Sequence, residues 1–232
     1  MSATAATPSA TSPPAPRERR APRVSDAAGG RASARERWNE RYGAGGFEAF
    51  PDAPAHWLVE HGALLDEVRA ARDEPRALDV ACGDGRNARH LAELGFSVDA
   101  VDVSDVAIGA LRAAAAASGL AVDARVADLE REPLPEDRYD VVVCMSYLQR
   151  DLFGALARAL RVGGVLLYET FARAHVEELG KPFNPAYVLD RNELLHAFAA
   201  LHVHHYREGI VARRGEPRGV ASLVAQRLSP AL

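Results

Sequence analysis

Apolar segments alternate with helical segments from residue 76 onward, and this alternation constrains the fold more than any other feature of the sequence. Each apolar segment is six to nine residues long, and helical patterns separate several of them. Strands that alternate with helices are joined by crossover connections, so they form a mainly parallel sheet with helices on both faces. The sequence therefore predicts an α/β fold, with strands at 76–81, 96–103, 121–128, 139–145 and 163–171 and helices at 85–95, 104–119 and 148–164.

The C-terminal part of the chain adds a helix and two more strands. Residues 190–201 have the pattern of a helix, and residues 202–211 and 218–228 have the pattern of strands. A short turn rich in Arg, Gly and Pro joins the two strands, which indicates an antiparallel hairpin at an edge of the sheet. The expected sheet has seven strands in all and is mostly parallel.

Residues 1–34 differ in composition from the rest of the chain. They contain almost no large apolar residue and are rich in Ala, Ser, Thr, Pro and Arg, so they cannot bury enough surface to offset the entropy of ordering. We expect a disordered leader. An organelle transit peptide has a similar composition, but a solvated extension is the favoured interpretation. Residues 35–75 are predicted to be helical, and residues 76–232 to form the sheet domain.

Two aromatic residues mark the first helix of the region 35–75. Trp38 and Tyr42 are four residues apart and therefore lie on one helix face. A second amphipathic segment follows at 53–68. Its apolar residues recur at helical spacing and predict one buried stripe, made of Trp57, Leu58, Leu64, Leu65 and Val68.

Charge and cysteine content limit the partners and the compartment. The formal net charge is -4 and the isoelectric point is about 6.1, so no overall field attracts nucleic acid. Cys82 and Cys144 cannot form a disulfide framework and are expected to be small buried residues of a reduced, cytoplasmic protein. No apolar run approaches the roughly 18 residues of a membrane helix. We predict a small-molecule substrate and neither a membrane nor a nucleic-acid partner; nothing in the sequence indicates the oligomeric state.

A glycine turn, "ACGDGRNA" at 81–88, follows the first predicted strand and opens a helix. Ligands of open parallel sheets bind beyond the carboxyl ends of the strands. Gly83 and Gly85 allow backbone to approach a ligand closely, and the N–H groups at the helix start face it. The turn also satisfies the dinucleotide pattern G-x-G-x-x-A, so a nicotinamide-dependent oxidoreductase is an alternative.

Three carboxylates near the ends of successive strands indicate which ligand binds. Asp79 lies in mid-strand, where an ionised carboxylate must be paired, and it would repel a pyrophosphate but attract an ammonium group. Asp102 follows Gly83 by nineteen residues, the position that accepts hydrogen bonds from ribose. Asp128 ends the third strand and suits an adenine amino group. S-adenosylmethionine carries all three groups; the alternative for each acid is a helix cap or turn residue.

These motifs resemble those of the class I S-adenosylmethionine-dependent methyltransferases over residues 76 to about 227. The resemblance implies a Rossmann-like seven-stranded sheet and S-adenosylmethionine as cofactor. It also implies roles for individual residues. Ala81 departs from the family motif, which often has glycine there. The implied cofactor residues are Asp79 for the methionine ammonium, Ala81, Gly83 and Gly85 in the loop under the cofactor, Asp102 for the ribose, Val103 and Leu129 with Asp128 around the adenine, and Met145 at the end of the fourth strand.

A narrower likeness concerns four segments, "WNERYGAG", "ACGDGRN", "SYLQRDLF" and "KPFNPAYVLDRNELLHAF". They resemble the tellurite-resistance and thiopurine-type branch of small-molecule methyltransferases. In that branch an N-terminal helix covers the cofactor, which implies that residues 35–75 form a lid. Trp38 and Tyr42 would then cover the cofactor, anchor the helix on the sheet, or do both.

The methyl acceptor is expected beyond the fourth strand, near "CMSYLQR" at 144–150. That segment lacks the Asn/Asp-Pro-Pro-aromatic motif of amine-methylating enzymes, and "NPAY" at 184–187 follows the fifth strand and is interpreted as a turn. Without a carboxylate or amide there, we expect an acceptor that is already nucleophilic: a thiolate, a selenium or tellurium oxyanion, or a phenolate. Tyr147 and Arg150 are candidates for its pocket, the alternative being a helix start with a solvated arginine. No general base is assigned.

A histidine cluster, "HVHH" at 202–205, lies in a predicted strand and is interpreted as an exposed strand face. No further ligand stands at metal spacing, so we predict no metal site. The sequence as a whole predicts an S-adenosylmethionine-dependent methyltransferase that acts on a small soluble acceptor. A nicotinamide-dependent oxidoreductase and an inactive cofactor-binding regulator are the alternatives.

Overall fold

The computed structural model describes residues 33–43, 52–181, 183–213 and 216–229. The predicted disordered leader lies outside these ranges apart from its last two residues. Ala34 is the first residue of helix α1 (Ala34–Arg41), and Ser33 is its N-cap, which forms a reciprocal capping box with Glu36. The helical region therefore begins slightly earlier than predicted.

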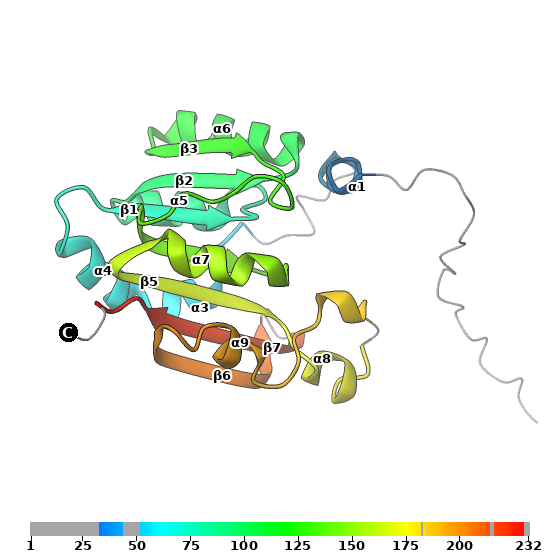
Figure 1. The fold of residues 1–232 in the computed structure, drawn as a ribbon. Helices are drawn as coiled ribbons and strands as arrows, with labels where there is room; N and C mark the ends of the chain where they lie inside the picture. The colour runs from blue at the N-terminus through cyan, green and yellow to red at the C-terminus, as the bar shows by residue number, and fades with distance from the viewer. Residues whose placement is uncertain (1–32, 44–51, 182, 214–215, 230–232) are drawn as a thin grey trace, which may run out of the picture. The chain divides into compact units, whose positions relative to one another are not determined.

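Seven strands form one sheet in the order β3-β2-β1-β4-β5-β7-β6 (Figure 1). The strands β1 to β5 pair in parallel, whereas β7 is antiparallel to both β5 and β6. This arrangement confirms the predicted mostly parallel sheet with a C-terminal antiparallel hairpin. The strands are β1 (Arg76–Val80), β2 (Ser97–Asp102), β3 (Val122–Val126), β4 (Tyr139–Met145), β5 (Leu160–Phe171), β6 (His202–Arg213) and β7 (Glu216–Gln226).

Helices cover both faces of the sheet (Figure 1). One face carries the buried side chains of α3 (His56–Glu60), α4 (Gly62–Ala70), α5 (Arg86–Glu93) and α6 (Asp105–Ser118). The other face carries those of α7 (Phe153–Ala159) and α9 (Glu193–Ala197). Covering on both sides explains why β4 is buried along its whole length. The remaining short elements are η2 (Arg150–Leu152), α8 (Ala174–Glu177) and η3 (Pro185–Tyr187).

The predicted helix at 148–164 is wrong in its last five residues, 160–164. Helix α7 ends at Ala159, and β5 begins at Leu160, which pairs with Tyr139 of β4. Leu160 is fully buried, so its packing in the core outweighs the helical pattern of its neighbours. Tertiary pairing thus lengthens the strand at its amino end.

The amphipathic segment 53–68 forms two short helices, α3 and α4, rather than one. The break falls at His61, next to Gly62, the first residue of α4, where glycine disfavours a continuous helix. Most of the predicted stripe is buried and Leu64 is half-buried. The stripe was therefore correctly assigned to the core although the helix is interrupted.

The histidines of "HVHH" are exposed on β6, where the rings of His202 and His204 lie 5.0 Å apart. Within the described ranges, no group of three histidine, cysteine or acidic residues is placed to hold a metal ion. Cys82 and Cys144 are both buried and are not joined in a disulfide, as expected for small core residues. None of the described helices combines the length and apolar character needed to cross a membrane.

Ala81 occupies a backbone conformation that favours glycine, with φ of 53°. We expect Ala81→Gly to stabilise the protein by about 0.5 kcal/mol, because relief of left-handed strain slightly exceeds the added entropy of the unfolded chain. Urea unfolding measures the change. The matched control Ala77→Gly, in the regular part of β1, should instead destabilise by about 1 kcal/mol; equal losses for both variants would show that Ala81 is unstrained.

Candidate active site

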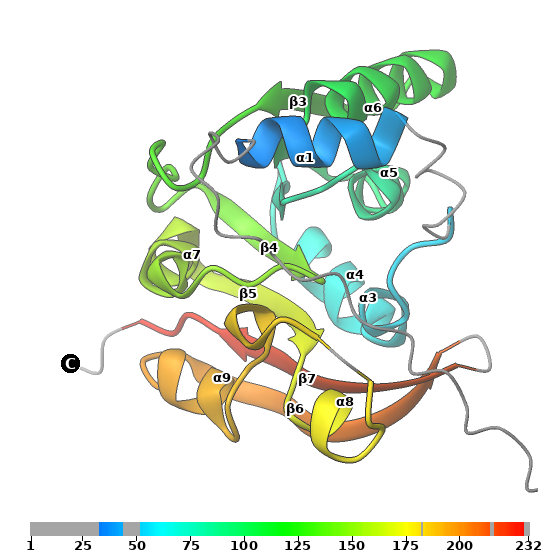
Figure 2. The same ribbon diagram turned by 90° about the vertical axis from the view of Figure 1, so that its right-hand side faces the viewer.

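The predicted cofactor residues converge at the carboxyl ends of β1 and β2. Figure 2 looks onto this edge of the sheet, with α1 lying in front of α5 and α6. The structure brings Asp79, Gly83 and Asp102 together with Tyr42 of the segment that follows α1. The glycine turn, the second strand and the N-terminal helix therefore build one site.

Asp79 is the most buried charged group of this site. Its side chain is 1% exposed, and its Oδ2 atom has no hydrogen-bond partner among the described residues. Burial raises the pKa of Asp79 to about 7, although a hydrogen bond from the backbone N–H of Ala88 opposes the shift. A buried carboxylate oxygen without a donor is costly. The position therefore suits a ligand that supplies a positive charge, and the contact of Asp79 with the ammonium group of S-adenosylmethionine stays a prediction.

The glycine turn uses both of its glycines in left-handed conformations. Gly83 has φ of 57° and Gly85 has φ of 82°. A Cβ atom at Gly85 would collide with Leu111 of α6, whose Cγ atom would be 2.7 Å away. Close packing of α5 against α6 thus requires glycine at this position, and the first turn of α5 opens directly beside Asp79.

Asp102 holds the glycine turn against the end of β2. Its two carboxylate oxygens accept hydrogen bonds of 2.9 Å from the backbone N–H groups of Gly83 and Ser104. Burial raises the pKa of Asp102, and these hydrogen bonds oppose the rise. The carboxylate therefore organises the loop in this structure, and its contact with a ribose stays a prediction. Val103, beside it, is half-buried.

Helix α1 is attached to the site through Asn39, which the sequence analysis did not single out. The amide of Asn39 donates to Asp105 Oδ1 at 2.7 Å, and its oxygen accepts from Ser104 Oγ at 2.7 Å. Both partners lie at the start of α6. The available signal was that Asn39 precedes Tyr42 by three residues and thus shares its helix face.

Tyr42 lies directly on the glycine turn. It is buried, and a Cβ atom at Gly83 would collide with its hydroxyl group. Burial and the nearby carboxylate of Asp102 raise the pKa of the phenol. The ring of Trp38 is half-buried and lies 5.9 Å from that of Tyr42. Tyr42 thus anchors the helix at the predicted cofactor position, whereas Trp38 supports it from the side.

We expect Asn39→Ala to weaken binding of S-adenosylmethionine about tenfold. Loss of the two hydrogen bonds costs about 1 to 2 kcal/mol of the docking of α1 over the turn. Isothermal titration calorimetry measures the affinity. Glu40→Ala alters an exposed residue of the same helix and serves as the control; equal affinities for both variants would contradict a covering role of α1.

Asp128 has the contacts of a turn residue. Its Oδ1 atom accepts from the backbone N–H of Glu130 at 3.1 Å, and Oδ2 lies 3.4 Å from Arg131 Nε. Leu129 is buried, and its carbonyl accepts from Gln149 Nε2 at 3.1 Å. This geometry favours the turn interpretation of Asp128. Contacts of Asp128 and Leu129 with adenine stay predictions.

Met145, Tyr147 and Arg150 lie beyond or at the end of β4. Met145 is buried, and the hydroxyl of Tyr147 donates to Gln149 Oε1 at 2.6 Å. Arg150 donates to both carboxylate oxygens of Glu193 and to the carbonyls of Ala186 and Val188. A guanidinium with these four hydrogen bonds clamps the segment after β5, so the structure does not favour the predicted attraction of an anion.

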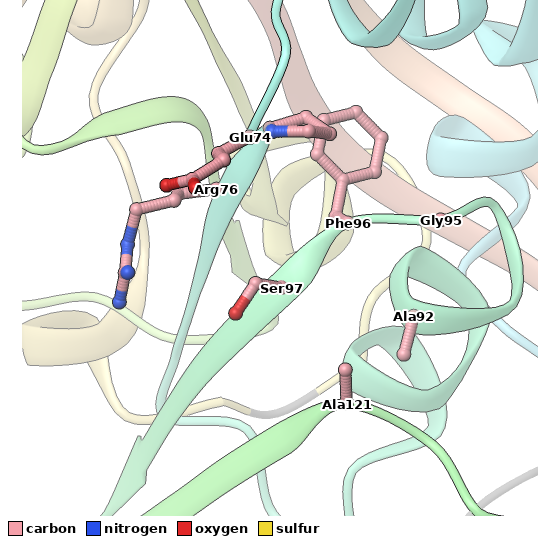
Figure 3. A pocket seen from close by; sticks show the side chains of 8 residues that line it. Glu74, Arg76, Ala92, Gly95, Phe96, Ser97 and Ala121 are labelled. Carbon is pink, nitrogen blue, oxygen red and sulfur yellow. The ribbon is translucent and has the colours of Figure 1, made fainter.

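Arg150 also lines a cavity of about 230 Å³, with Arg173, Phe183 and neighbouring residues of α8 and η3. A larger cavity of about 360 Å³ lies at the amino ends of β1, β2 and β3, away from the carboxyl ends where the predicted cofactor residues converge. Figure 3 shows Phe96, Ala92 and Ala121 around this second cavity. It contains none of the predicted site residues and is separate from the site described above.

Comparison with known proteins shows similarity to methyltransferases in sequence and in fold. Residues 77–164 match a family model described as a methyltransferase domain. Curated relatives include the ubiquinone biosynthesis O-methyltransferases of Burkholderia vietnamiensis and Burkholderia multivorans, each 36% identical over 126 residues. The alignment covers 50% of this chain and 50% of each relative. The chain therefore spans about half the length of the curated relatives that it matches.

Solved structures share the fold. TehB from Haemophilus influenzae superposes with a TM-score of 0.59 at 19% identity, covering 71% of this chain and 62% of that protein. An S-adenosylmethionine-dependent methyltransferase from Mesorhizobium loti gives a TM-score of 0.54 at 20% identity and covers 69% of this chain and 96% of that protein. Residues 77–164 are thus similar in sequence to methyltransferase domains, and the chain shares the fold of TehB and of the Mesorhizobium loti methyltransferase.

Proposed function

We propose that the protein transfers a methyl group from S-adenosylmethionine to a small-molecule acceptor in the cytoplasm. The observation that carries this proposal is the buried carboxylate of Asp79, whose Oδ2 atom lacks a hydrogen-bond partner among the described residues. The ammonium group of the cofactor supplies the missing positive charge. The two buried cysteines fit a reducing compartment.

The residues of the site then have separate tasks. Asp79 binds the ammonium group, the turn at 81–85 lies under the methionine moiety, and Asp102 accepts hydrogen bonds from the ribose. Tyr42 covers the turn and excludes water from it. Bound S-adenosylmethionine supplies an electrophilic methyl carbon, so the protein contributes alignment and water exclusion rather than a strong chemical group of its own.

The acceptor class is part of the proposal. The curated relatives are named O-methyltransferases, which makes hydroxyl compounds the first class to test. Thiols and the oxyanions of selenium and tellurium form the second class, expected from the sequence. The buried Asp79 disfavours a nicotinamide dinucleotide, because its pyrophosphate would lie close to a carboxylate.

Calorimetry followed by a transfer assay tests this function. We expect S-adenosylmethionine to bind and NADH not to bind; binding of NADH alone would overturn the assignment. Protein incubated with S-adenosylmethionine labelled in its methyl group should then label phenols, thiols, tellurite or selenite. Binding without any transfer would instead favour an inactive cofactor-binding regulator.

A further inference from the structure

Glu169 of β5 is a carboxylate that the sequence analysis did not consider. It is paired in register with Met145, the last residue of β4, on one side and with Ser222 of β7 on the other. Register partners present their side chains on the same face of a sheet. Glu169 therefore lies beside the end of β4, beyond which the methyl acceptor is expected, although it comes from the neighbouring strand.

This face of the sheet is the face that holds Asp79. Asp79 is in register with Val143, and Val143 with Leu167, so Glu169 lies two strands across and two residues farther toward the carboxyl edge. Ordinary strand spacings place the two Cα atoms about 12 Å apart. That separation leaves room for the methionine part of the cofactor and an acceptor between the two carboxylates.

Neighbouring side chains hold the Glu169 carboxylate in place. Its Oε2 atom accepts from Ser222 Oγ at 2.6 Å and lies 3.3 Å from Arg207 Nη2. The same nitrogen of Arg207 lies 3.2 Å from Glu60 Oε2, and its guanidinium stacks 4.3 Å from the ring of Trp57. The position is thus built from β5, β6, β7 and α3, and one guanidinium is shared by two carboxylates.

Partial exposure makes this carboxylate accessible. The Glu169 side chain is 14% exposed, whereas Ser222 behind it is fully buried. A carboxylate accepts hydrogen bonds but donates none, so it suits an acceptor that carries a proton. An anionic acceptor would be repelled by the Glu169 carboxylate, because the single positive charge of Arg207 is shared between Glu169 and Glu60.

We infer that Glu169 is the acceptor-binding base of this enzyme and that the acceptor is a neutral hydroxyl compound rather than an oxyanion or thiolate. This inference rests on the proposed function. Glu169 accepts the hydrogen bond of the hydroxyl and takes its proton. In the transfer the acceptor oxygen forms a bond to the methyl carbon, the bond from that carbon to sulfur breaks, and its electron pair stays on sulfur. Ser222 and Arg207 act as positioning residues.

Glu169→Gln tests this role with phenol and catechol as acceptor probes. We expect the variant to bind S-adenosylmethionine with the wild-type Kd and to lose about 100-fold or more in kcat at pH 7. The loss should shrink as the pH approaches 10, because a phenol then ionises without a base. A rescue of this kind is not expected from a merely structural change.

Glu60→Gln is the matched control, because it removes the other carboxylate of the same guanidinium. We expect it to lose less than about tenfold in kcat and to keep the wild-type pH profile. If Glu169→Gln fails to bind S-adenosylmethionine, Glu169→Asp decides: a loss of about tenfold supports the inference, and a kcat within twofold of wild type overturns it.

Three results with the full-length chain contradict the inference. A kcat of Glu169→Gln within threefold of wild type would show that Glu169 is not the base. Methylation of tellurite, selenite or 2-mercaptoethanol, but of no phenol, would overturn the inference and leave the proposed function intact. Binding of S-adenosylmethionine without transfer to either class would overturn both.

Discussion

Asp79→Asn is expected to lower the affinity for S-adenosylmethionine by about 100-fold or more. The ammonium of the cofactor loses its charge-assisted partner in a buried site, which costs about 3 kcal/mol or more. The same substitution should make the ligand-free protein more stable above pH 7 by about 2 kcal/mol, because it removes a buried ionised group. Calorimetry and urea unfolding measure the two effects.

The pH dependence of this effect has a definite sign. Burial raises the pKa of Asp79 in the folded protein to about 7, above its ordinary value of 3.8. Its contribution to stability is therefore fully present below about pH 4 and is lost as the pH rises to 7. The stability difference between Asp79→Asn and wild type should vanish near pH 4, grow as the pH rises to 7 and stay constant above that.

Cofactor binding by the wild-type protein should follow the same group. The bound ammonium favours the ionised carboxylate, so binding releases a proton below pH 7 and affinity falls as the pH decreases. Calorimetry in two buffers of different ionisation enthalpy detects that proton. Asp123→Asn, at an exposed position of β3, is the control; an Asp79→Asn protein with wild-type affinity would remove the basis of the cofactor assignment.

Gly85→Ala is expected to destabilise the protein by about 3 kcal/mol and lower Tm by about 9 °C. Gly85 has φ of 82°, and a Cβ atom there would collide with the side chain of Leu111. Leu111 is fully buried, so its side chain can move away only by disturbing the packing of the core. The separation of α5 from α6 must therefore increase, which also displaces the glycine turn.

Gly119→Ala separates the two causes of this loss. Gly119 is also left-handed, with φ of 63°, but an added Cβ atom would meet nothing within 4 Å. We expect this control to cost only about 1 kcal/mol, from backbone strain alone. Calorimetric unfolding of both variants measures the difference. Equal losses would show that close packing against Leu111 does not require glycine at position 85.

Much of the architecture could be predicted from local patterns. The bounds of β4 agree with the prediction at both ends, and the other strands agree within a few residues. The alternation of apolar runs with helical patterns is a local property of the backbone and needs no knowledge of distant contacts. The error at Leu160 arose where pairing with Tyr139 of β4 replaced the last turn of the predicted helix.

The candidate site was predicted less completely. Asp79 and the glycine turn can be recognised from their neighbours in the sequence and were singled out, whereas Asn39 and Glu169 were not. The partner of Asn39, Asp105, is 66 residues away, and the Ser222 partner of Glu169 is 53 residues away. Contacts over such separations depend on the order of the strands, which the local pattern does not contain.

The sequence by itself was sufficient to predict the seven strands, the position of the glycine turn and the placement of the Asp79 carboxylate within a strand. These follow from backbone periodicity and from the chemistry of single residues. Only the tertiary structure decided that α1 is attached beside the glycine turn, that Arg150 forms an ion pair with Glu193, and that Glu169 lies beside Met145. Such neighbours are chosen by packing across the whole chain, because burial and charge pairing act between surfaces that meet only after the sheet has assembled.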